Sequence, residues 1–152
     1  VLARSVFTPD EVAKLRSAVA AEGARAKASG RVLKSHTGEV VPVGDIAGVP
    51  GLEKLLGDPR LVTLAKELLD TRELVYFGDS GVMVGGALRG FHKDNTCRDD
   101  ATHADWRSPY GLLRMGIYLQ DHEHYSGGLK LRVGSHLHAD VTTGTRRGRS
   151  RM

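Results

Sequence analysis

The chain has 152 residues, of which 40% are hydrophobic and 26% charged, as in a single globular domain with a modest core. No apolar stretch is long enough to span a bilayer and no signal-peptide pattern opens the sequence, so we expect no membrane partner. The net charge of +4 is accounted for by an Arg-rich tail at residues 141–152. Such a short tail is usually solvated, and because no aromatic residues are interleaved with its arginines we do not expect nucleic-acid binding.

The first predicted element is a helix over residues 5–28. Thr8 is the expected N-cap, Pro9 occupies the first helical position, and Glu11 completes a Thr-x-x-Glu capping box. Phe7 before the cap and Val12 inside the helix are expected to form a hydrophobic staple. The apolar stripe consists of Val12, Leu15, Ala18 and Val19.

Short apolar pieces broken by Gly and Pro follow in residues 31–51, and they predict one or two short strands or loops. Residues 52–56 are expected to form a turn of helix. Asp58 and Pro59 then predict the start of a second helix, whose apolar face is Leu61, Leu64, Ala65, Leu68 and Leu69. We therefore expect residues 1–72 to be a mostly helical scaffold.

From residue 73 onward, apolar residues recur with the two-residue period of strands. Strands are predicted at residues 74–77, 82–84, 112–119 and 129–133, and the third has one fully apolar face. Two helices followed by several short strands predict an α+β fold that is mainly β, either an antiparallel sandwich or a barrel with helices packed outside. Residues 73–140 would supply the barrel strands of this single domain.

The His92-Lys93-Asp94 segment is the strongest candidate site. In an extended backbone the side chains of His92 and Asp94 project to the same side, with Lys93 on the other. One imidazole and one carboxylate are two of the three ligands of the facial triad that binds Fe(II). The alternative is a polar pair in a surface loop. The single cysteine, Cys97, excludes an internal disulfide and favours a reducing compartment such as the cytoplasm.

Four segments occur in an order that resembles the phytanoyl-CoA dioxygenase-like family of Fe(II)- and 2-oxoglutarate-dependent oxygenases. They are residues 7–11 (FTPDE), 90–95 (GFHKDN), 114–122 (RMGIYLQDH) and 127–136 (GGLKLRVGSH). The resemblance implies a double-stranded β-helix (jelly roll) with flanking N-terminal helices. It also implies that His92 and Asp94 hold Fe(II), which with 2-oxoglutarate and dioxygen oxidises an unactivated C–H bond of a small-molecule substrate.

Two departures from the family pattern affect the expected site. Val133 replaces the usual proline before the Gly-Ser-His sequence, which is a minor change. The family's second iron-binding histidine, and the arginine that pairs with 2-oxoglutarate, lie beyond the end of this sequence. We therefore expect a jelly roll that is incomplete at its C-terminus and part of a longer protein, with unpaired strand edges. His136 and His138 are the in-chain substitutes for the third ligand.

The distal carboxylate of 2-oxoglutarate needs a cation and a hydroxyl. Arg114 and Tyr118 lie on the polar face of their predicted strand and are the candidates, although Arg114 would equally suit a solvent-facing position. Trp106 and Arg107 would border the substrate, with a packing role as the alternative for Trp106.

Two other functions stay open. One is a non-catalytic, truncated jelly-roll module that serves in interaction. The other is a cupin-like metalloprotein that uses His122 and His124, whose His-x-His spacing resembles the first cupin motif.

Overall fold

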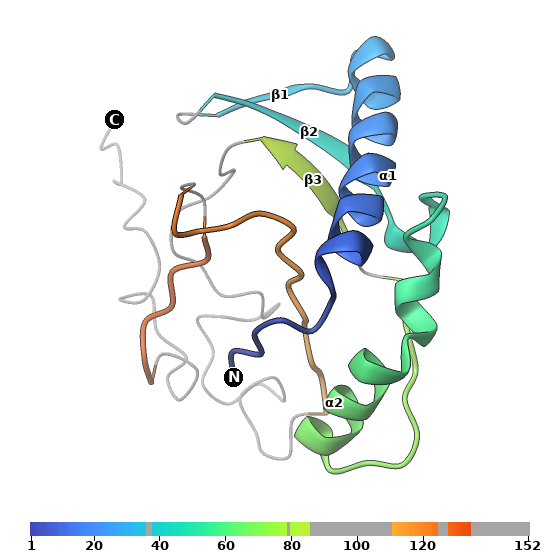
Figure 1. Cartoon of the computed structure of the whole chain (residues 1–152), viewed down its shortest axis with the longest axis vertical. Coiled ribbons are helices and arrows are strands. Elements are labelled where there is room, and N and C mark those ends of the chain that lie inside the picture. The colour runs from blue at the N-terminus through green and yellow to red at the C-terminus, as the bar shows by residue number, and fades with distance from the viewer. Residues whose placement is uncertain (36–37, 79, 86–110, 125–127, 135–152) are drawn as a thin grey trace, which may run out of the picture.

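The computed structural model describes residues 1–35, 38–78, 80–85, 111–124 and 128–134. In these ranges the fold is α+β, with helices α1 (Pro9–Ala28) and α2 (Pro59–Leu69) and a small antiparallel sheet. Figure 1 shows α1 lying across the sheet and α2 near the N-terminal end of α1. The α+β class is confirmed, whereas the double-stranded β-helix stays a prediction.

Helix α1 begins as the capping box predicts, although at Pro9 rather than at residue 5. The Thr8 N–H donates to Glu11 Oε2 over 2.7 Å, and the Glu11 N–H donates to Thr8 Oγ1 over 3.3 Å. These two bonds satisfy backbone groups that the first helical turn leaves without partners. The helix ends at Ala28, where the Ser29 N–H donates to Arg25 O over 3.1 Å and the Gly30 N–H donates to Lys27 O over 3.0 Å.

The sheet has the order β1-β2-β3, with β1 at Leu33–Ser35, β2 at Gly38–Gly44 and β3 at Val82–Gly85. Val41 pairs with Val84 across the β2–β3 ladder. Helix α1 packs on this sheet at Gly23, where an added Cβ would lie 3.3 Å from Val84 Cγ2. Gly23 therefore permits a close approach of helix and sheet.

The core lies where α1, β2 and two 3-10 helices meet. The 3-10 helices are η1 (Ile46–Gly48) and η2 (Glu53–Gly57). Leu52 is only 2% exposed and packs in this cluster. The other buried members are Leu15, Val43, Val49 and Leu55.

Helix α2 has the capping signals that the Asp58-Pro59 sequence predicts. Asp58 is the N-cap and its carboxylate accepts a hydrogen bond from the Arg60 N–H over 3.0 Å. Asp70, the C-cap, adopts the left-handed conformation with φ of 49°. The helix contacts the core through Leu61, which is partly buried against it.

Three strand predictions are wrong in the part of the chain that is described. Residues 74–77, 112–119 and 129–133 are not assigned to strands, and β3 is the strand that residues 73–85 contribute. Alternating apolar residues favour a half-buried extended segment, but a strand also requires a hydrogen-bonded neighbour in register. Residues 1–72 are mostly helical as expected, and β1 and β2 confirm the short strands predicted within residues 31–51.

Among the residues described, no helix is both long and apolar enough to cross a membrane.

Candidate functional site

Most of the predicted metal and substrate residues lie outside the described residues. They are His92, Asp94, Trp106, Arg107, His136 and His138. Within the described ranges, no three His, Cys, Asp or Glu side chains gather closely enough to hold a metal ion. The iron ligands His92 and Asp94 therefore stay a prediction.

The two residues predicted to bind the carboxylate of 2-oxoglutarate, Arg114 and Tyr118, are described and exposed. The apolar positions next to Tyr118 behave in the opposite way, because Ile117 and Leu119 are partly buried against the core. The predicted apolar side is thus confirmed at Ile117 and Leu119 but not at Met115, which is 39% exposed, and the segment is not a strand. This arrangement leaves both side chains accessible to a ligand.

Tyr118 makes an aromatic contact with a histidine four residues further along the chain. The ring centroids of Tyr118 and His122 are 4.7 Å apart and the ring planes meet at 74°, a T-shaped arrangement. An aromatic pair of this geometry is favourable because a positive ring edge meets a negative ring face. We call these two residues the Tyr118–His122 pair.

Two glycines lie against the Tyr118–His122 pair. A Cβ placed on Gly116 would lie 3.6 Å from Tyr118 Cε2, and one placed on Gly128 would lie 3.4 Å from His122 Nδ1. The sequence contained both glycines, but nothing in their spacing indicated that they flank one aromatic pair. Sequence reasoning therefore missed the role of His122 beside Tyr118.

The second histidine of this turn, His124, pairs with a different group. Its Nδ1 lies 2.7 Å from Asp121 Oδ2, and Asp121 Oδ1 accepts a hydrogen bond from the Glu123 N–H over 2.8 Å. The Glu123 N–H and then the His124 ring lower the pKa of Asp121. His122 and His124 thus contact different partners, and in the described residues they belong to no metal-binding group of three.

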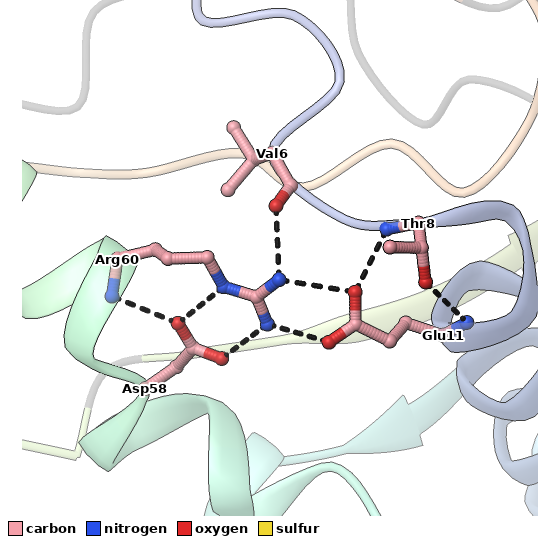
Figure 2. A network of polar contacts seen from close by, with 5 residues as sticks. All are labelled: Val6, Thr8, Glu11, Asp58 and Arg60. Carbon is pink, nitrogen blue, oxygen red and sulfur yellow. Dashed lines mark hydrogen bonds and ion pairs between the residues drawn. The ribbon is translucent and has the colours of Figure 1, made fainter.

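A polar cluster joins the first turns of α1 and α2, and we call it the Arg60 clamp (Figure 2). The guanidinium of Arg60 donates to both carboxylate oxygens of Glu11, over 3.0 and 2.8 Å. It also donates to both carboxylate oxygens of Asp58, over 3.0 and 2.7 Å, and to Val6 O over 3.1 Å. All five guanidinium N–H donors therefore have an acceptor.

The electrostatics of the Arg60 clamp follow from this geometry. The hydrogen bond from Arg60 is the largest cause that lowers the pKa of Glu11, to about 2, and also the pKa of Asp58, to about 2. These two carboxylates raise the pKa of Arg60 in turn. The guanidinium also lies 4.5 Å from the centroid of the Phe7 ring. Because its donors are all engaged within the fold, we assign the clamp a structural role.

A second polar cluster ties the segment after α2 to η1. The Tyr76 hydroxyl lies 2.9 Å from Asp45 Oδ2 and 2.8 Å from Ser80 Oγ, and Ser80 Oγ accepts from the Ile46 N–H over 2.8 Å. The Ala47 N–H is the largest cause that lowers the pKa of Asp45. Asp45 is the N-cap of η1. An aspartate at this position is a signal for the start of a helix, and the sequence analysis did not use it.

Comparisons of this chain with protein-family models, with curated proteins and with solved structures find no match.

Proposed function

We propose that this chain carries part of an Fe(II)- and 2-oxoglutarate-dependent oxygenase domain of the jelly-roll class, which oxidises a C–H bond of a small molecule. The observation that carries the proposal is the order of four segments, residues 7–11, 90–95, 114–122 and 127–136, within one chain. A reducing compartment, the cytoplasm, suits both Fe(II) and the single Cys97.

The described residues support the part of this proposal that concerns 2-oxoglutarate. An arginine and a tyrosine hydroxyl are suited to a carboxylate, because the guanidinium supplies paired N–H donors and the phenol one O–H donor. Arg114 and Tyr118 both stand exposed on a segment whose apolar side packs on the core. A ligand can therefore reach them without any rearrangement of that core.

The roles in the proposed site follow from the chemistry of each group. His92 and Asp94 would hold Fe(II), with the third ligand from His136, from His138 or from outside this sequence. Bound Fe(II) supplies the activation of dioxygen, with 2-oxoglutarate as the electron donor. Arg114 and Tyr118 would orient the co-substrate through its distal carboxylate. Trp106 and Arg107 would border the substrate.

An anaerobic titration tests this proposal. Fe(II) is added to the 152-residue chain, then 2-oxoglutarate, and the weak visible charge-transfer absorption of the Fe(II)–2-oxoglutarate complex is recorded. We expect the absorption with the wild-type chain and its loss in His92→Ala. A folded wild-type chain without this absorption would contradict the proposal.

A second candidate function is a non-catalytic module that binds another protein. The exposed apolar side chains of one short segment favour it, since contiguous apolar surface marks interaction sites. Leu129, Leu131 and Val133 are at least two-thirds exposed. If the titration fails, sedimentation tests this function with a second copy of the chain as the partner. A wild-type dimer that Leu131→Lys abolishes would support it, and a wild-type chain that stays monomeric would contradict it.

A further inference from the structure

We infer that His122 is a positioning residue for 2-oxoglutarate, because its ring sets the orientation of Tyr118 and hence the place of the Tyr118 hydroxyl. The inference rests on the proposed function and deepens it, because it adds His122 to the 2-oxoglutarate site. The sequence had connected His122 only with the cupin-like metal site.

The rings of Tyr118 and His122 are in direct contact. His122 meets Tyr118 in a T-shaped arrangement with a centroid separation of 4.7 Å, within the range in which aromatic pairs attract. The side chain of Tyr118 is 46% exposed, so the protein core does not by itself fix its ring. A neighbouring ring is therefore important for holding one orientation.

The ring of Tyr118 also lies against the backbone two residues before it. Its Cε2 lies 3.6 Å from the position of a Cβ on Gly116, so the ring lies against Gly116. The ring of Tyr118 therefore has two neighbours, Gly116 and the imidazole of His122. These two contacts limit the orientations of the ring, and with them the place of the hydroxyl that the proposed function assigns to the 2-oxoglutarate carboxylate.

The imidazole of His122 has a backbone neighbour of its own. Gly128 brings its backbone against the imidazole, with the position of an added Cβ 3.4 Å from Nδ1 and 3.5 Å from Cγ. The other histidine of the same turn, His124, is engaged with a different residue, because its Nδ1 lies 2.7 Å from Asp121 Oδ2. The aromatic contact is therefore specific to His122.

The test measures the Kd of 2-oxoglutarate by the charge-transfer absorption of the Fe(II)-loaded 152-residue chain, under anaerobic conditions. The variants are His122→Ala, His122→Phe, Tyr118→Phe and the matched control Glu123→Ala, from the same turn. Because an aromatic pair contributes a modest free energy, we expect a Kd raised roughly threefold to tenfold in His122→Ala. We expect a similar rise in Tyr118→Phe, and a nearly wild-type Kd in His122→Phe, which keeps a ring, and in Glu123→Ala.

A second readout needs neither metal nor co-substrate. The ring protons of Tyr118 in the metal-free chain, followed by NMR, should shift in His122→Ala and not in Glu123→Ala, because the imidazole beside them is removed.

The outcomes separate this inference from the proposed function. An unchanged Kd in His122→Ala, or a His122→Phe variant as weak as His122→Ala, would overturn the positioning role while the wild-type chain still binds 2-oxoglutarate. If the wild-type chain does not bind 2-oxoglutarate, the proposed function fails and the inference fails with it, even where the Tyr118 ring protons shift as expected.

Discussion

Arg60 connects segments that lie far apart in the sequence. Its guanidinium binds Glu11 of α1 and Asp58 at the start of α2, and it also donates a hydrogen bond to the Val6 carbonyl. Glu11 serves the capping box of α1 at the same time, through the Thr8 N–H. One residue therefore couples the start of α1 to the start of α2.

The pH dependence of stability should reveal the Arg60 clamp. Glu11 and Asp58 have pKa values lowered to about 2, so they stabilise the folded chain above their unfolded pKa values, near 4. This stability is lost as the pH falls from about 5 toward 2. In Arg60→Gln we expect a thermal midpoint lower by a few degrees at pH 7 and a shallower fall on acidification, since exposed ion pairs contribute modestly.

Arg25→Gln is the matched control for this experiment, because the ion pair of Arg25 with Glu22 lies within α1. Acid melting curves of Arg60→Gln that run parallel to those of the wild type, measured by circular dichroism, would show that the clamp does not couple the two helices.

Gly85 provides a second prediction at the residue scale. Its φ is 111°, and an added Cβ would clash with Glu39 O, a backbone atom of β2. Gly85→Ala is therefore expected to lower the free energy of unfolding by on the order of 2–3 kcal/mol, through backbone strain and the clash. Gly57→Ala is the control, because nothing lies within 4 Å of its added Cβ. Urea unfolding measures both, and equal effects would contradict the prediction.

At the scale of single elements, the end of α2 leaves room for stabilisation. Asp70 adopts the left-handed conformation at the C-cap, with φ of 49°. A side chain is disfavoured there, and a negative charge at a helix C-terminus opposes the helix dipole. Asp70→Gly should raise the free energy of unfolding by about 0.5–1 kcal/mol. A lower midpoint in urea unfolding would contradict this account of the C-cap.

The elements that sequence reasoning predicted well are those whose signals are local. The Thr8–Glu11 capping box and the Asp58-Pro59 start of α2 involve residues within one turn, and both were confirmed. The strand prediction at residues 82–84 also holds, as β3.

The remaining features depend on contacts between distant segments, which periodicity does not encode. The alternation at residues 112–119 predicted the burial of Ile117 and Leu119 but not the exposure of Met115. It also did not predict the absence of a strand, because strand pairing requires a hydrogen-bonded neighbour that the pattern of one segment does not reveal. Gly23 of α1 packs on Val84, 61 positions further along the sequence, and no local signal predicts that contact. Of the candidate site, sequence reasoning found Arg114 and Tyr118 but not the contact of Tyr118 with His122.

At the scale of the whole molecule, the described residues form a helical layer on a small sheet, with the residue 111–124 segment attached through Ile117 and Leu119. Core positions in this arrangement should tolerate truncation poorly. Leu52→Ala is expected to lower the free energy of unfolding by about 2–5 kcal/mol, because Leu52 is only 2% exposed and lies in the central cluster. Exposed Leu68→Ala, on α2, is the control for urea unfolding, and an equal loss there would contradict the placement of the core.

The central claim is that His92 and Asp94 together bind iron. Anaerobic equilibrium dialysis of the 152-residue chain against Fe(II) tests it most directly, with His92→Ala, Asp94→Ala and His122→Ala compared under the same conditions. We predict that the wild-type chain and His122→Ala retain one Fe(II) each, whereas His92→Ala and Asp94→Ala lose it. Iron binding that survives in His92→Ala and disappears in His122→Ala would contradict the claim and favour the cupin-like site.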